Sequence, residues 1–346
     1  MKHTLLLFAA AATFFATTAA PGFAQTPDPL GTATGTTITC PKGKMTGNVC
    51  YRVAVTGCEN TASVNAYFKI TLPSVSPIGF IVFASGGAVT DLYEVYTYGT
   101  TALNNVVAAG YAVAQMSFGG VFTKTQPNGW LVGSGGPRAA ACNYATAIQW
   151  VYANLAGNGA IPMCLTGNSS GAALIGYALA HYGMGSVVTF AEVTSGPPYS
   201  HMEEGCIPGT PDTETPCGEG MQGYGVGLSN AKSYIDPSYG ATPGPICSEA
   251  WETKSSKNKQ TFIDDSILSG DEQLSYTQTG VNFVFGGQDF SSAPNQGNAY
   301  YEAITSPFKT LSCAPAAPHS IPNNLSGATQ IGNDLIASCK FVVRQH

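Results

Sequence analysis

Residues 163–171 read MCLTGNSSG, a short apolar run followed by the pattern Gly167-x-Ser169-x-Gly171. This pattern is typical of a strand that turns into a helix within a few residues and leaves the serine hydroxyl exposed on a strained corner. Glycines are required because bulkier side chains would clash with adjacent backbone there. Because the chain has 41 glycines, about 0.4 matches to this pattern are expected by chance. The elements on either side of the pattern are therefore the stronger evidence. The pattern follows a buried strand and opens a helix, which makes Ser169 a candidate nucleophile.

The sequence around this corner predicts a parallel sheet. Continuous apolar runs suit strands that are buried on both faces, as in a parallel sheet covered by helices. Such runs occupy residues 80–83, 111–114, 163–165, 187–190 and 281–285. Patterns with helical spacing lie between them, over 141–155, 174–183 and 328–339. This alternation predicts an open, doubly wound and mostly parallel α/β sheet.

Two other parts of the chain have a different character. Segments 51–55 and 66–70 alternate between apolar and polar residues, which predicts strands with one solvent-exposed face. Segment 26–39 is rich in Pro, Gly and Thr, and we expect it to be a loose arm. The stretch from about 195 to 280 is rich in Pro, Gly, Asp and Glu and interrupts the alternation. We therefore expect a single domain over 25–346 with an inserted lid over about 195–280.

The N-terminus has the features of a secretory signal. Met1-Lys2-His3 is a positive start, 4–20 is apolar or small, and Gly22-Phe23-Ala24 offers small residues for cleavage before Gln25. An uncleaved membrane anchor is the alternative, although the apolar stretch is short for the roughly 20 residues of a span. The ten cysteines are an even number without a CxxC pair, which indicates disulfides. We expect residues 1–24 to be removed and the protein to be secreted or periplasmic.

Composition excludes several classes of protein. Hydrophobic residues make up 44% of the chain, enough for a sizeable core. With 14 basic and 20 acidic residues, the net charge is −6 and no basic run is present. Nucleic-acid binding, which needs a basic footprint, is therefore not expected. No further run is long enough to span a membrane, and the dispersed histidines predict no metal site.

At the Ser169 motif the chain resembles the α/β-hydrolase family, in particular its secreted bacterial serine esterases. The resemblance runs from about Phe80 to the C-terminus, apart from the lid. It implies an α/β-hydrolase fold and a triad in the order Ser, Asp or Glu, and His, which candidates in this chain obey. It also implies that no cofactor is needed.

The resemblance indicates positions for the other two triad members. His319 lies in a loop after the apolar segment 308–313 and before the final helix, as the family's catalytic histidine does. Asp289 follows the apolar run 281–285 and resembles the family's usual acid. Glu192, just after 187–190, is the rival acid, and either carboxylate could instead be a solvated loop residue. His201 is expected to be a lid or pocket residue.

An oxyanion hole needs two backbone N–H groups. Ser170, the residue after the nucleophile, should supply one. The loop Ala84-Ser85-Gly86-Gly87-Ala88 is similar to the family's HGGG-type loop but lacks the histidine and has only two glycines. Gly87 is the predicted second donor, with Gly86 or Ala88 as alternatives. The loop could instead be an ordinary glycine turn with no role in an oxyanion hole.

Helix faces and parity suggest disulfide partners. Cys339 lies on the face of the last helix that should meet the sheet, and Cys313 ends the strand beneath it, so we expect these two to pair. Cys142 and Cys164 are plausible partners in the adjacent helix and strand. Two groups of three then remain, which predicts at least one bridge between the N-terminal part and the lid. These groups are Cys40, Cys50 and Cys58, and Cys206, Cys217 and Cys247.

Together these features predict a secreted serine hydrolase that cleaves carboxylic esters through an acyl-enzyme intermediate. The substrate is a small-molecule or polymeric ester, and the low charge and 17 tyrosines hint at an uncharged one. A serine peptidase or amidase on the same fold is the alternative within enzymes. The alternative outside enzymes is a catalytically inactive binding protein with a hydrolase fold.

Overall fold

The computed structural model describes residues 25–209, 216–217 and 234–340. Their centre is a nine-stranded sheet with the order β1-β2-β3-β5-β4-β6-β7-β8-β9. Strands β4 to β9 pair in parallel, and β1, β2 and β3 continue the sheet antiparallel to their neighbours. The strands are β1 (Thr32–Ile38), β2 (Val49–Thr56), β3 (Val64–Thr71), β4 (Phe80–Ala84), β5 (Ala112–Ser117), β6 (Met163–Asn168), β7 (Phe190–Thr194), β8 (Gly280–Gly286) and β9 (Lys309–Ala314).

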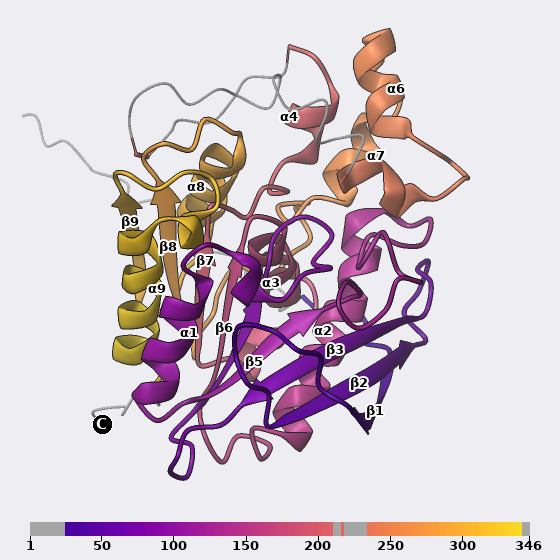
Figure 1. The fold of residues 1–346 in the computed structure, drawn as a ribbon. Helices are drawn as coiled ribbons and strands as arrows, with labels where there is room; N and C mark the ends of the chain where they lie inside the picture. The colour runs from indigo at the N-terminus through magenta and orange to yellow at the C-terminus, as the bar shows by residue number, and fades with distance from the viewer. Residues whose placement is uncertain (1–24, 210–215, 218–233, 341–346) are drawn as a thin grey trace, which may run out of the picture.

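Helices cover both faces of the sheet (Figure 1). On one face α1 (Gly99–Ala108) packs against α9 (Leu325–Ser338), and on the other α2 (Gly136–Asn154) packs against α3 (Ser170–Ala180). Helix α8 (Ala293–Ala303) packs against β8. Strands β4, β5, β6 and β8 are buried along their whole length, as both-face coverage requires. The predicted doubly wound, mostly parallel α/β sheet is therefore confirmed.

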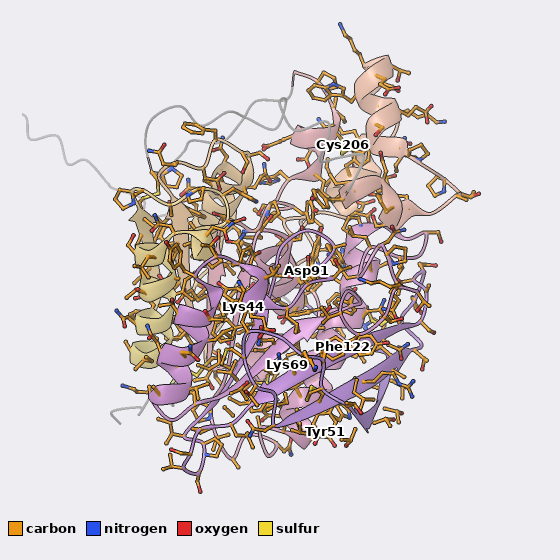
Figure 2. The ribbon with its side chains drawn as sticks, viewed as in Figure 1. Lys44, Tyr51, Lys69, Asp91, Phe122 and Cys206 are labelled. Atoms are coloured by element: carbon orange, nitrogen blue, oxygen red, sulfur yellow. A yellow bond between two sulfur atoms is a disulfide. The ribbon has the colours of Figure 1, made fainter. Side chains whose placement is uncertain are left out.

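The antiparallel strands differ from the predicted one-sided pattern in one respect. β2 alternates between buried and accessible residues, but β3 is buried almost throughout. Lys69 on β3 is fully buried because its ammonium pairs with Glu94 at 3.0 Å (Figure 2). A buried charge is tolerated only with such a partner.

Two boundaries differ from the sequence-based expectation. The loose arm predicted over 26–39 contains β1, which pairs with β2 along its full length, and its threonines favour an edge strand. Gly35 is required there because a Cβ atom would lie 2.0 Å from the Trp150 ring. The strand predicted over 187–190 begins only at Phe190, because Met184–Ser186 forms a 3-10 turn.

Three helices of the predicted lid lie at the end of the sheet toward which the arrows of β8 and β9 point (Figure 1). They are α4 (Met202–Cys206), α6 (Ile246–Thr253) and α7 (Lys259–Asp264). Residues 210–215 and 218–233 lie outside the described residues, so the lid as a unit stays a prediction. The predicted signal peptide, 1–24, lies outside them too. Within the described ranges, no helix is long and apolar enough to cross a membrane.

All ten cysteines lie in the described part of the chain and are paired, but each predicted pairing is wrong. Cys313 does not pair with Cys339, nor Cys142 with Cys164, and no disulfide joins the lid to Cys40, Cys50 or Cys58. The observed pairs are Cys40–Cys50, Cys58–Cys142, Cys164–Cys339, Cys206–Cys247 and Cys217–Cys313.

The sides of the sheet explain these corrections. Cys164 and Cys339 belong to the apolar core on the α1/α9 face, whereas Cys142 belongs to the core on the opposite face. Ala314 lies in the α1/α9 core, so Cys313, the residue before it on β9, points to the other face because side chains alternate along a strand. The parity argument then fails, since it started from two wrong pairs.

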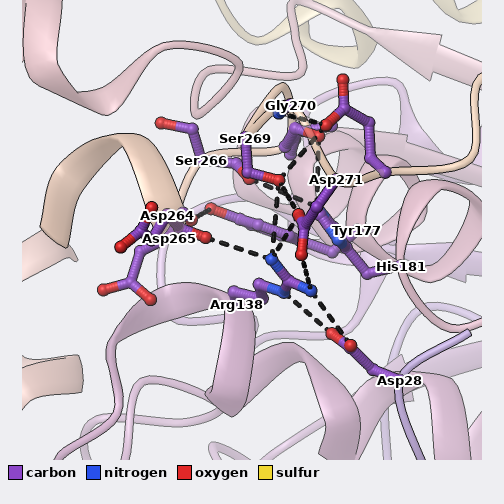
Figure 3. A network of polar contacts seen from close by, with 12 residues as sticks. Asp28, Arg138, Tyr177, His181, Asp264, Asp265, Ser266, Ser269, Gly270 and Asp271 are labelled. Carbon is purple, nitrogen blue, oxygen red and sulfur yellow. Dashed lines mark hydrogen bonds and ion pairs between the residues drawn. The ribbon is translucent and has the colours of Figure 1, made fainter. Parts of the chain in front are cut away.

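An ionic network fastens the start of the described chain to the domain (Figure 3). Arg138 of α2 donates to Asp28 at 2.8 Å and to Asp271 at 2.7 Å. It also donates to the backbone oxygen of Asp264. One guanidinium thus joins the N-terminal arm, α2 and the loop after α7 through a planar set of donors suited to two carboxylates.

Candidate active site

Ser169 occupies the sharp corner between β6 and α3. Its φ and ψ are 57° and −117°, a strained conformation for a residue with a side chain. A Cβ atom on Gly167 would lie 2.4 Å from the Gly171 backbone, and one on Gly171 would lie 2.5 Å from the Ser85 oxygen. The two glycines of the motif are therefore sterically necessary, as the sequence predicts.

The structure brings Ser169, His319 and Asp289 together. His319 Nε2 lies 2.9 Å from Ser169 Oγ, and His319 Nδ1 lies 2.9 Å from Asp289 Oδ2. Asp289 follows β8, whereas His319 lies in the loop between β9 and α9, so the three side chains come from loops at the same edge of the parallel sheet. Asp289 is buried, and the imidazole is 38% exposed.

Electrostatics determine the tautomer of this histidine. Burial raises the pKa of Asp289, but the hydrogen bond and charge of His319, with two hydrogen bonds from Ser291, outweigh it and hold the pKa below its usual value. An ionised carboxylate only accepts hydrogen bonds. Nδ1 therefore carries the imidazole proton, and Nε2 is left to accept the hydrogen bond of the Ser169 hydroxyl.

Ser291 supports this pair and is absent from the sequence-based candidates. Its Oγ donates to Asp289 Oδ1 at 2.7 Å and lies 3.1 Å from His319 Nδ1. Its backbone N–H donates to the same carboxylate oxygen at 3.0 Å. The signal in the sequence is Asp289-Phe290-Ser291, because an aspartate often accepts a backbone bond from two residues further on.

Asn168 joins the corner that holds Ser169 to the loop that holds His319, and it is absent from the sequence-based candidates. Its Oδ1 accepts from the Ile321 backbone N–H and from the Thr194 hydroxyl, both at 3.1 Å. The backbone carbonyl oxygen of Thr194 in turn accepts from the Ser169 backbone N–H at 2.9 Å. Only the fold shows that these loops meet.

The rival acid Glu192 is not paired with His319. It is fully buried on β7, and neither carboxylate oxygen has a hydrogen-bond partner in the described structure. Burial raises its pKa well above the usual value, the charge of Asp334 raises it further, and Asn282 lowers it only in part. His201, for its part, lies 3.5 Å from Glu203 and does not line the cavity described below.

The loop after β4 contains a tight turn in which the Gly86 carbonyl accepts from the Val89 N–H at 3.1 Å. Gly87 has a φ of 63°, which favours glycine. Because N–H and C=O point in opposite directions across a peptide, the Gly87 N–H points out of this turn. Neither it nor the Ser170 N–H has an acceptor among the described residues. The Gly86 N–H, in contrast, is taken by the Tyr96 hydroxyl at 2.8 Å.

A cavity of about 570 Å³ opens over these groups. Ser169, His319, Ser170 and Gly87 all line it. Its wall includes Tyr96, Tyr199 and Tyr234. Asp91, which Figure 2 labels, belongs to the loop between β4 and α1 and is the single acidic residue among the described lining residues. No group of three or more residues within the described ranges could hold a metal ion.

Comparisons with known proteins identify the fold. No protein-family model matches the sequence, and no curated protein matches it. Among solved structures, the thermophilic carboxylesterase EstE1 from a metagenomic library aligns with a TM-score of 0.50 and 14% identity, over 86% of this chain and 92% of its own. Dienelactone hydrolase from Anabaena variabilis gives 0.46 and 12%, over 84% and 95%, and monoglyceride lipase from Saccharomyces cerevisiae gives 0.47 and 13%, over 81% and 93%. At such identities the EstE1 likeness shows the fold, which is the predicted one.

Proposed function

We propose that this chain, which has the α/β-hydrolase fold, is an exported serine hydrolase that cleaves carboxylic esters. One observation carries the proposal: a single imidazole lies 2.9 Å from both a strained, solvent-facing serine hydroxyl and a buried carboxylate. This is the arrangement that activates a serine for attack on an acyl group. The similar structure EstE1 is a carboxylesterase, which agrees with it.

In the first half of the reaction, Ser169 Oγ attacks the carbonyl carbon of the ester while His319 Nε2 takes its proton. Asp289 holds the Nδ1–H and stabilises the imidazolium that forms. The negative charge that develops on the carbonyl oxygen is stabilised by the N–H groups of Ser170 and Gly87. The tetrahedral intermediate then collapses, the alcohol leaves with the proton from Nε2, and Ser169 remains acylated.

In the second half, water attacks the acyl-enzyme and His319 again serves as the base. The same N–H groups stabilise the second oxyanion, and the acid product leaves as Ser169 regains its proton. Every group that acts in these steps belongs to this chain or to water. An amide could follow the same course, so peptide substrates belong in the test.

Export rests on independent features. The N-terminal segment has the composition of a signal peptide. All ten cysteines are paired, and disulfides persist in oxidising compartments such as the periplasm or the cell exterior. We propose that residues 1–24 are removed there; mass spectrometry of the secreted protein should find Gln25 at its N-terminus.

A fluorophosphonate probe and an ester panel test the activity. The probe should form a covalent adduct on Ser169, and Ser169→Ala should form none while keeping the thermal melting curve of the wild type. The panel should compare short- and long-chain esters, phenolic esters, polyesters and peptide amides. Faster cleavage of amides than of esters with the same acyl group would replace the esterase by a peptidase. An unlabelled Ser169 in folded wild-type protein would indicate an inactive binding protein.

A further inference from the structure

Tyr96 places its hydroxyl beside the proposed nucleophile. The residue follows the 3-10 turn Tyr93–Val95 and lines the same cavity as Ser169. Tyr96 Oη and Ser169 Cβ both lie 3.3 Å from the point that a Cβ atom on Gly86 would occupy. The phenol oxygen and Ser169 Cβ are therefore both next to Gly86, each 3.3 Å from the same point.

The hydrogen bonds of this hydroxyl leave its proton free. A phenol has one O–H donor and two acceptor lone pairs. Tyr96 Oη accepts from the Gly86 N–H at 2.8 Å. The O–H proton itself has no acceptor among the described residues.

The same surroundings keep the phenol neutral and in place. Burial raises the pKa of Tyr96 to about 12, with a smaller rise from Asp91 and opposing effects from Gly86 and Asn168. It therefore retains its proton at neutral pH. Its ring packs edge-on against Tyr93, with centroids 5.1 Å apart. The Gly86 N–H that the oxygen accepts also polarises the O–H bond and makes it a better donor.

We propose that the Tyr96 hydroxyl is a third donor of the oxyanion hole, in addition to the N–H groups of Ser170 and Gly87. The inference rests on the proposed ester hydrolysis. Tyr96 donates a hydrogen bond to the substrate oxygen as that oxygen gains negative charge, and it keeps its proton throughout. The Gly86 N–H, which cannot reach the substrate, contributes by fixing the phenol.

The variant Tyr96→Phe tests this role. A lost oxyanion-hole donor lowers kcat by about 10²- to 10³-fold, and we expect that loss with little change in KM. Tyr93→Phe is the matched control, because its buried hydroxyl has no hydrogen-bond partner in the described structure and does not line the cavity. We expect Tyr93→Phe to keep wild-type kcat.

A second measurement separates catalysis from a displaced glycine loop. A trifluoromethyl ketone forms an adduct with the serine, and this adduct carries an oxyanion. The control ligand is an amide with the same acyl group, which is not cleaved and binds without forming an adduct. Tyr96→Phe should weaken the ketone by the factor lost in kcat/KM and leave amide binding unchanged. Equal weakening of both ligands would assign Tyr96 a structural role only.

The failures of the two proposals are distinguishable. If wild-type protein cleaves no ester and Ser169 takes no fluorophosphonate, the proposed function is wrong. If the wild type is active and Tyr96→Phe stays within about threefold of it, only the role of Tyr96 is overturned. A loss in Tyr93→Phe equal to that in Tyr96→Phe would also overturn it.

Discussion

Cys164 and Cys339 form a disulfide that joins the strand leading to Ser169 to the end of the helix that follows His319. Their Cα atoms are 5.9 Å apart although 175 positions separate them in sequence. The bridge lies in the apolar core between the sheet and α9. It therefore links the two segments from which the proposed nucleophile and base project.

Removal of this disulfide should destabilise the protein more than removal of a short one. Cys40 and Cys50 are only 10 positions apart and serve as the control. In the chain-entropy account, a long closed loop constrains the unfolded state more, by about 2 kcal/mol for this difference. The double variant Cys164→Ala/Cys339→Ala should thus lose about 5 kcal/mol and Cys40→Ala/Cys50→Ala about 3, as measured by urea denaturation. Equal losses would contradict the argument.

The triad acid can be identified by a pair of isosteric changes. Asp289→Asn should lower kcat by about 10⁴-fold, because the amide no longer enforces the correct imidazole tautomer. Glu192→Gln should keep wild-type kcat, since no hydrogen bond joins Glu192 to His319. Steady-state kinetics on one ester measures both. The assignment of Asp289 is wrong if the two variants behave in the opposite way.

Ser291 should act as a positioning residue for the Asp289–His319 pair. Ser291→Ala removes the 2.7 Å hydrogen bond to the carboxylate, and a bond to a charged group is worth about 1.5–3 kcal/mol. We expect kcat to fall about tenfold or more, with the acid limb of the pH–rate profile shifted. Ser292→Ala is the control, because Ser292 lines the same cavity and its side chain has no hydrogen bond to Ser169, Asp289 or His319 in the described structure. A Ser291→Ala variant with unaltered kcat and pH profile would remove this role.

Asp265 should make stability depend on pH. Burial raises its pKa from 3.8 to about 7, although the Tyr239 hydroxyl, 2.7 Å away, and Arg138 lower it in part. At a pH between 3.8 and about 7, the Asp265 carboxyl is ionised in the unfolded chain but keeps its proton in the folded protein. The stabilising effect is therefore complete at acid pH and is lost as pH rises toward 7.

The variant Asp265→Asn should remove that dependence. Its amide oxygen can still accept from Tyr239, so the melting temperature at pH 8 should exceed that of the wild type. The fall between about pH 4 and 7 should flatten. Differential scanning calorimetry across this range is the measurement. If the melting temperatures of the wild type and the variant change by the same amount over this pH range, Asp265 does not titrate there.

Local sequence was sufficient to predict the fold class and the sharp corner that holds Ser169. Period-two and continuous apolar patterns predict strands because they report which faces are buried, and the helical spacing between them predicts the layers. Gly167, Ser169 and Gly171 specify the corner because the steric reason for the glycines lies within five residues. Asp289 and His319 were predicted from the resemblance to the α/β-hydrolase family, whose catalytic loops follow parallel strands and meet at one edge of the sheet.

Contacts between distant segments were decided only by the tertiary structure. The disulfide partners depend on which side of the sheet each cysteine faces, and one step along a strand reverses that side, as at Cys313. The bonds of Ser291, Asn168 and Tyr96 depend on the paths of separate loops across the sheet edge. A hydrogen bond forms only when its two heavy atoms lie about 3 Å apart. Residue type and spacing along the chain do not predict the positions of loop side chains that closely.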